Sequence, residues 1–119
     1  MNIKRLIGDA GESYTAKWLK KHRYKIVENN YSCRFGEIDI IAQNKQFICF
    51  VEVKTRAQTA IDRPASAVGY AKQRRIITTA YHYLNENPVD LQPRFDVAEV
   101  ITNGDRVEDF NYIENAFGE

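Results

Sequence analysis

Apolar side chains recur every three or four residues in two stretches of the chain. This spacing is typical of helices that bury one face. It predicts two helices, over residues 3–22 and 67–85. Short runs of apolar residues, many of them β-branched or aromatic, predict five strands, over residues 24–30, 37–43, 46–54, 94–101 and 106–113.

The segments between these runs fix how neighbouring elements connect. Residues 44–46 leave room only for a hairpin, and Asn103-Gly104 marks a second one. Residues 55–66 are polar, contain Pro64 and predict a loop. The resulting order is α-β-β-β-α-β-β, which indicates an α/β (mixed α+β) fold with a mixed central sheet flanked by helices. At 119 residues, we expect one domain, spanning 1–119.

Three charged residues interrupt the apolar pattern of the second and third strands. Asp39, Glu52 and Lys54 stand where Val or Ile would be expected in a buried strand. A charge in such a run is costly unless it is paired or binds a metal. The other residues of these strands are those of a core: Ile38, Ile40, Ile41, Ala42, Phe47, Ile48, Cys49, Phe50, Val51 and Val53.

The hairpin register decides whether these charges meet. A two-residue loop at Lys45-Gln46 places Asp39 directly opposite Glu52. A loop at Asn44-Lys45 would instead pair Asp39 with Phe50. Both registers leave Asp39 and Glu52 on one face, because cross-strand partners share a face and side chains alternate. Lys54 lies on that face as well.

Two carboxylates a few ångströms apart repel each other when both are ionised, and a hard divalent cation relieves the repulsion. Mg²⁺ is commonly held by one or two carboxylates, water and a substrate phosphate. A lysine beside such a site can position the attacking water or stabilise charge on phosphorus. The alternatives are a structural ion pair between Glu52 and Lys54, or a solvated charged face. Three charges in register favour the functional site.

Composition and charge narrow the classes of protein. The net charge is +1, from 17 basic and 16 acidic residues, so the total does not itself indicate nucleic-acid binding. Basic residues gather at 17–25 and 72–75, whereas the tail after Gly104 is acidic; this distribution is compatible with a basic face for a polyanion or with a solvated helix end. The two cysteines form no zinc or disulfide pattern. Without a signal peptide or a transmembrane-length run, we expect a cytoplasmic protein with no membrane partner.

The motifs G-E-I-D-I-I-A at 36–42 and F-V-E-V-K-T-R at 50–56 resemble the YraN family of small bacterial proteins described as predicted nucleases. Further matches are Gly8, Gly11-Glu12, Lys72, R-F-D-V at 94–97, and Asn115-Ala116-Phe117. The D…E-x-K pattern also resembles the wider PD-(D/E)xK superfamily, which has a restriction-endonuclease-like core of order α-β-β-β-α-β. Ile38 stands where that motif has proline.

The resemblance implies a metal-dependent nuclease acting on phosphodiester bonds with Mg²⁺ or Mn²⁺. Asp39 and Glu52 would hold the metal, with the Val53 carbonyl as a further ligand, and Lys54 would act on the water. The family is also similar to archaeal Holliday-junction resolvases, in which a helical glutamate joins the site. Glu12 is the matching residue, and its alternative is an exposed helix carboxylate.

Other residues are weaker candidates. Glu37 and Gly36 would support the site, or would only begin a strand and serve a turn. Asp96 would support the site or pair with Arg94, and we favour the pairing. Phosphate contacts are expected from the second helix and the long loop, against the alternative of a solvated surface: Lys72, Gln73, Arg74, Arg75, Arg56 and Arg63.

The sequence thus predicts a metal-dependent nuclease that binds nucleic acid, with DNA favoured over RNA. Specificity for a DNA structure is implied only by the resolvase resemblance. A resolvase-like role would need a homodimer. One alternative is a non-catalytic nucleic-acid-binding or protein-binding module of the same fold. A third hypothesis is a metal-dependent hydrolase that uses the same carboxylates on another phosphoester.

Overall fold

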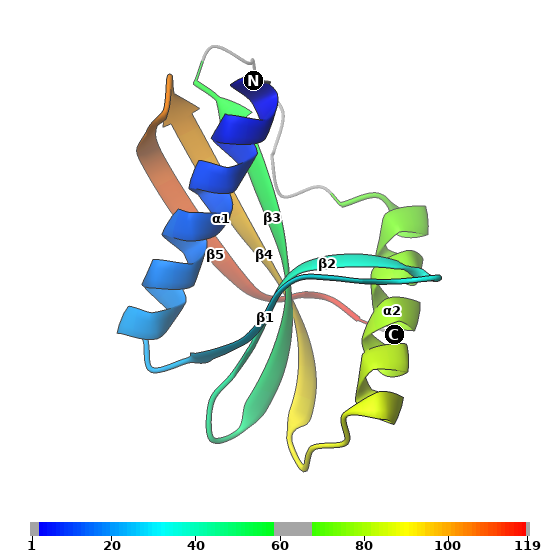
Figure 1. Cartoon of the computed structure of the whole chain (residues 1–119). Helices are drawn as coiled ribbons and strands as arrows, with labels where there is room; N and C mark the ends of the chain where they lie inside the picture. Colours follow the sequence, from blue (N-terminus) through cyan, green and yellow to red (C-terminus); the bar gives the residue numbers. More distant parts are fainter. Residues whose placement is uncertain (1–2, 59–67, 119) are drawn as a thin grey trace.

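The computed structural model describes residues 3–58 and 68–118, which form two helices and five strands (Figure 1). The elements are α1 (Ile3–Lys21), β1 (Lys25–Cys33), β2 (Gly36–Gln43), β3 (Phe47–Ala57), α2 (Tyr70–Glu86), β4 (Gln92–Asn103) and β5 (Arg106–Phe117). The predicted α-β-β-β-α-β-β order is confirmed. Neither helix, over the described positions, is long and apolar enough to span a membrane.

The five strands form one mixed sheet in the order β1-β2-β3-β4-β5. Neighbouring strands are antiparallel except β3 and β4, which run parallel. Parallel neighbours need a long connection, and α2 lies in the one that joins β3 to β4. Strands β3 and β4 contribute residues to the apolar clusters on both faces of the sheet. This burial on both faces explains their near-continuous apolar runs.

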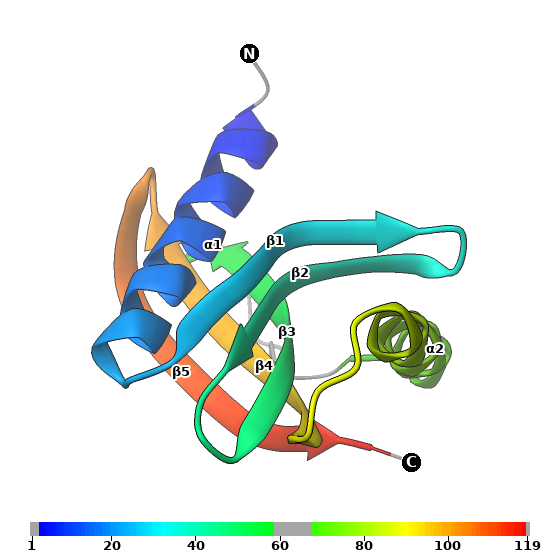
Figure 2. The same ribbon diagram turned by 60° about the horizontal axis from the view of Figure 1, so that its bottom comes forward.

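The helices lie on opposite faces of the sheet, and each covers its own apolar cluster (Figures 1 and 2). The cluster under α1 contains Leu19, Ile40, Ala42, Cys49, Val51 and Ala98. The cluster under α2 contains Ile38, Ile41, Ile48, Phe50, Val68, Ile76, Ile77, Ala80, Tyr83, Phe95 and Val97. Alternate residues of β3 thus point to different helices: Ile48 and Phe50 face α2, whereas Cys49 and Val51 face α1.

The β1–β2 hairpin bends away from β3 and extends over α2 (Figure 2). Gly36 begins β2 with a φ of +149°, in a region that side-chain-bearing residues rarely adopt. A Cβ at this position would lie 3.0 Å from the Thr79 hydroxyl of α2. Gly36 therefore serves the turn and the close contact with α2, which favours the structural alternative for this residue.

Several boundaries differ from those predicted, mainly because β1, β3, β4 and β5 are longer. Strand β3 continues to Ala57, because Thr55, Arg56 and Ala57 pair with β4. Arg56 consequently lies in a strand, and its placement in a loop was wrong. Helix α2 begins at Tyr70, since residues 68–69 are not helical. Arg63 lies outside the described residues.

Candidate functional site

The structure pairs β2 with β3 in the register predicted for a two-residue loop. Ile40 faces Val51 and Ile41 faces Phe50, so the same register carried one pair further sets Asp39 against Glu52. The alternative that pairs Asp39 with Phe50 was wrong. The turn is held by Asn44, whose side-chain oxygen accepts hydrogen bonds from the backbone N–H groups of residues 46 and 47 at 2.9 and 2.7 Å.

Beyond the Ile40–Val51 pair the two strands diverge, and the Asp39 side chain bridges them. The backbone N–H of Val53 donates a hydrogen bond to Asp39 Oδ2 at 2.8 Å, which fixes the carboxyl group beside β3. Glu52 is the next residue back along β3, and it is only 6% exposed. Two carboxyl groups thus share a poorly hydrated position where the sheet opens.

The raised pKa of Asp39 shows that it is unfavourable for both carboxyl groups to be ionised. Burial, followed by the negative charge of Glu52, raises the pKa of Asp39 to about 7, and the Val53 N–H only partly offsets the rise. A hydrogen bond also joins the two carboxyl groups. Without a divalent cation, the pair therefore retains a proton close to neutral pH. This is the environment that a divalent cation would relieve.

Glu52 already has one cationic partner, and it is not the lysine that the sequence suggested. The Lys72 ammonium, on the first turn of α2, contacts Glu52 Oε2. The alternative interpretation, a structural ion pair between Glu52 and Lys54, was wrong. Lys54 is half-buried on the same face of β3, two residues from Glu52, and no ion pair of Lys54 is found within residues 3–58 and 68–118.

Helix α1 brings a third carboxylate toward this pair. The helix passes close to β3 at Gly11, where a Cβ would lie 2.2 Å from the Thr55 hydroxyl, so only glycine permits the approach. The next residue, Glu12, is half-buried, and its charge contributes to the raised pKa of Asp39. The pKa of Glu12 is itself raised, first by burial, while a hydrogen bond from Asn30 opposes the rise.

The donor set suits a hard cation that is completed by water and substrate. Within the described ranges, no group of three or more His, Cys, Asp or Glu side chains is arranged to hold a metal ion by itself. Two adjacent carboxyl groups are nevertheless a normal protein contribution to a Mg²⁺ site. The residues present therefore fit Mg²⁺ or Mn²⁺ as an open site and do not form a closed structural one.

Comparison with known proteins places the chain in a family. A family model described as "Uncharacterised protein family UPF0102" matches residues 11–100. The chain belongs to the UPF0102 family. This agrees with the YraN resemblance found in the sequence.

Several UPF0102 proteins match over nearly their whole length. The one from Caldanaerobacter subterraneus is 44% identical over 117 residues, covering 96% of each chain. The one from Clostridium acetobutylicum is 42% identical over 117 residues, covering 97% of this chain and 96% of its own. The one from Alkaliphilus metalliredigens is 40% identical and is covered completely. These names state no activity, so a function must be argued from the site.

In this UPF0102 chain, the predicted phosphate-binding residues of α2 separate into different environments. Lys72 reaches the carboxyl pair, whereas Arg74 and Arg75 are exposed. The Gln73 side chain donates a hydrogen bond to the Val68 carbonyl at 2.7 Å, so it secures the start of the helix. Glu37 is exposed on β2, and its charge contributes to the raised pKa of Glu12.

Asp96 lies on the opposite face of the sheet from Glu52. It pairs in register with Val51 of the cluster under α1, whereas Glu52 pairs with Val97 of the cluster under α2. Its carboxylate accepts hydrogen bonds from the Arg94 guanidinium at 2.9 Å. The favoured pairing with Arg94 is confirmed. A role in supporting the site was wrong, because the sheet separates Asp96 from the carboxyl pair.

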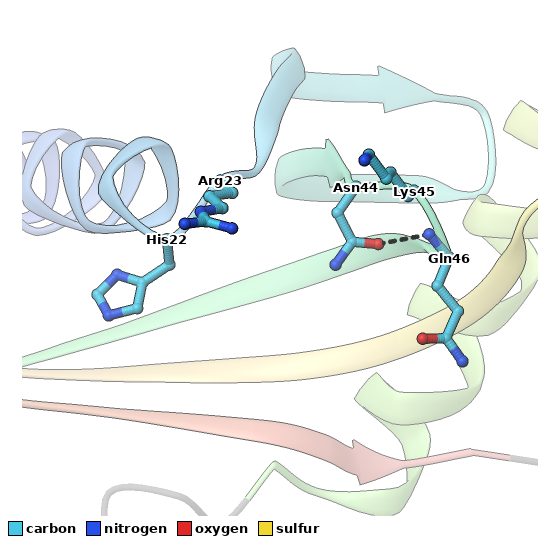
Figure 3. Close-up of a pocket in the computed structure, with 5 residues that line it drawn as sticks. All are labelled: His22, Arg23, Asn44, Lys45 and Gln46. Carbon is cyan, nitrogen blue, oxygen red and sulfur yellow. Dashed lines mark hydrogen bonds between the residues drawn. The ribbon is translucent and has the colours of Figure 1, made fainter.

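A polar cavity of about 360 Å³ lies where α1 ends, beside the β2–β3 turn (Figure 3). It is lined by His22, Arg23, Asn44, Lys45 and Gln46. Arg23 has a φ of 71° and caps the helix, with Tyr24 N–H bonded to the Leu19 carbonyl at 3.0 Å. Arg23, one of the basic residues of the segment 17–25, therefore helps to terminate α1.

Asn30 and Asp9 also belong to the surroundings of the site, although no strong feature of the sequence selects them. Asn30 hydrogen-bonds Glu12 and has a φ of 55°, a conformation that asparagine tolerates better than most residues. Asp9 precedes Glu12 by almost one helical turn and raises its pKa. Only the Asn29-Asn30 dipeptide could have drawn attention to this position.

The raised pKa of Asp39 predicts that Asp39→Asn stabilises the metal-free protein near neutral pH. The folded state binds the Asp39 proton more tightly than the unfolded state, whose pKa is near 3.8. That contribution to stability is fully present below about pH 4 and is lost as the pH rises through about 7. Asparagine resembles the protonated acid, so its advantage should be absent at low pH and should grow over this interval.

Urea unfolding in the presence of a chelator, at several pH values from about 4 to 8, would measure this difference. Glu37→Gln, an exposed acid on the same strand, is the matched control and should show little pH-dependent gain. A difference between wild type and Asp39→Asn that stays constant across the range would contradict the prediction.

Proposed function

We propose that this UPF0102 chain is a metal-dependent nuclease that hydrolyses nucleic-acid phosphodiester bonds, with DNA favoured over RNA. The observation that carries the proposal is the pair of adjacent carboxyl groups, half-buried Asp39 and buried Glu52, with Lys54 on the same face of β3. The pattern and the α-β-β-β-α-β core support a place in the PD-(D/E)xK superfamily. The positions of these side chains indicate which of them would hold the metal and which would act on the attacking water.

Asp39 and Glu52 would hold Mg²⁺ or Mn²⁺, with the Val53 carbonyl as a further ligand. When bound, the metal would lower the pKa of a water molecule and polarise the phosphate. The Val53 N–H orients Asp39 by its 2.8 Å hydrogen bond. Glu12, whose charge reaches the pair from α1, would bind outer water, as expected from the resolvase resemblance.

Lys54 would position the attacking water and stabilise negative charge on the phosphate. Its side chain is half-buried, and a positive charge in a poorly hydrated position acts more strongly than one in bulk water. Lys54 lies two residues after Glu52 on the same face of β3. The Lys54 ammonium and a metal held by Glu52 could therefore both contact one phosphate.

The start of α2 would bind the nucleic-acid backbone. Its N-cap, Gly69, makes no side-chain capping bond, and Arg74 and Arg75 are exposed in the first turns. Helix N-termini and cationic side chains both attract phosphates. Binding should therefore weaken steeply as salt is added. A resolvase-like cut in both strands would need two sites, which a homodimer would supply.

The test is cleavage of labelled single-stranded, duplex, flap and four-way-junction DNA and matching RNA, with Mg²⁺, Mn²⁺ or a chelator. We expect wild type to cleave at least one substrate only with metal, and Asp39→Ala to cleave none. Asp105→Ala, which removes an exposed acid in the β4–β5 turn, should remain active. Metal-independent cleavage, or equal cleavage by Asp39→Ala, would contradict the proposal.

A second candidate function is a non-catalytic nucleic-acid-binding module. The Lys72–Glu52 ion pair favours it, because the carboxyl pair already has a cation of the protein's own. Salt-sensitive DNA binding by wild type, without cleavage of any substrate in the panel, would support this alternative.

A further inference from the structure

The ammonium group of Lys72 lies against Glu52, one of the two carboxyl groups that would hold the metal. It contacts Glu52 Oε2. The two partners differ in environment: the Glu52 side chain is 7% exposed and that of Lys72 is 43% exposed. The carboxylate is therefore fixed in the sheet, whereas the lysine approaches it from the solvent side.

Lysine is suited to leaving such a contact. Its ammonium is a compact charge at the end of a flexible stem, and it becomes well hydrated when it swings outward. Lys72 lies on the first turn of α2 and meets the carboxyl pair only through its side chain. The side chain can therefore exchange partners without any change in the sheet or the helix.

We propose that Lys72 is an exchangeable cation of the site: it neutralises Glu52 when no metal is bound, and a divalent metal displaces it toward the substrate phosphate. This proposal rests on the proposed nuclease function and specifies how the site is regulated. Two cations cannot both lie against Glu52 without repelling each other, so Lys72 opposes metal binding until a phosphate is present to receive it.

The exchange links metal binding to substrate binding. In the metal-free protein, Lys72 is engaged by Glu52 and contributes little to phosphate binding. Once metal has displaced it, its charge joins those of Arg74 and Arg75 at the start of α2. Because linkage is reciprocal, metal should strengthen DNA binding and DNA should strengthen metal binding. Lys72 thereby acts as a positioning residue that favours assembly of the site on its substrate.

The first measurement is the affinity for Mn²⁺ alone, by calorimetric titration of wild type, Lys72→Ala and Lys72→Arg. Arg74→Ala is the matched control, because it removes one positive charge from an exposed position of the same helix turn. We expect Lys72→Ala to bind Mn²⁺ about tenfold more tightly, the effect of removing one close charge. Lys72→Arg and Arg74→Ala should stay near the wild-type value.

The second measurement is binding of labelled duplex DNA with Ca²⁺ or with a chelator. Wild type should bind more tightly with Ca²⁺, and Lys72→Ala should lose most of that gain. A variant that had merely lost an ordinary phosphate contact would be weakened equally with and without metal. That result would overturn the exchange.

The outcomes separate this inference from the nuclease proposal. If wild type and Lys72→Ala bind Mn²⁺ equally, the exchange is wrong while the metal site stands. Tighter binding by Arg74→Ala to the same degree as by Lys72→Ala would also overturn it, because the effect would then be general electrostatics. If neither wild type nor Lys72→Ala binds Mn²⁺, the inference and the proposed function fail together.

Discussion

Replacing Lys54 by methionine is expected to lower the rate of metal-dependent cleavage by about 100- to 1000-fold, the usual effect of removing one group that stabilises transition-state charge. Methionine keeps most of the length and apolar surface of the lysine stem, so the packing of β3 should be retained. Since Lys54 makes no ion pair within residues 3–58 and 68–118, its removal leaves no described carboxylate without a partner.

The measurement is single-turnover cleavage of the best substrate from the panel, together with Mn²⁺ affinity. The cleavage rate should fall while Mn²⁺ affinity is retained or slightly increased, because Lys54 would act on water and phosphate and not as a ligand. Lys45→Met, at the exposed turn of the same hairpin, is the control and should cleave normally. Wild-type rates in Lys54→Met would remove this lysine from the mechanism.

The arrangement of Asp39 and Glu52 could be predicted from the sequence because it depends on local rules. The three residues 44–46 restrict the hairpin to a few registers, and alternation of side chains carries the charges to one face. Even the incorrect register would have kept both carboxyl groups on that face. This part of the site is therefore a property of the hairpin alone.

The partner of Glu52 could not be predicted in the same way. Lys72 is twenty positions further along the chain, and its contact depends on how α2 docks on the sheet. Nothing in the helical period specifies that docking. The length of β3 was missed for a related reason: Thr55 and Arg56 are polar, but residues 55–57 pair with the parallel strand β4.

The position of Asp96 also follows from long-range pairing. Its burial could be read from its apolar neighbours, but the face it occupies depends on the β3–β4 register, which no turn residue specifies. That register sets Asp96 opposite Val51 and away from Glu52. The buried acids Glu52 and Asp96, on neighbouring strands, therefore point to opposite faces of the sheet, Glu52 toward α2 and Asp96 toward α1.

Asp96→Ala is expected to lower the free energy of unfolding by roughly 3–5 kcal/mol, because it leaves the buried Arg94 guanidinium without its main partner. Both side chains are at most 8% exposed. Asp96 also accepts a hydrogen bond from the Tyr112 hydroxyl at 2.6 Å and one from the Asn115 N–H at 2.9 Å, which fix β5 to β4. A domain of this size is stable by only about 5–15 kcal/mol, so much of that stability would be lost.

Chemical unfolding followed by circular dichroism would measure the loss, with Asp105→Ala in the exposed β4–β5 turn as the control, expected to change stability by about 0.5 kcal/mol or less. The double variant Asp96→Ala/Arg94→Met should recover part of the loss, because it removes the unpaired charge and keeps apolar volume. A small effect of Asp96→Ala alone would mean that water reaches Arg94. The sheet would then tolerate the loss of its main polar contact under α1.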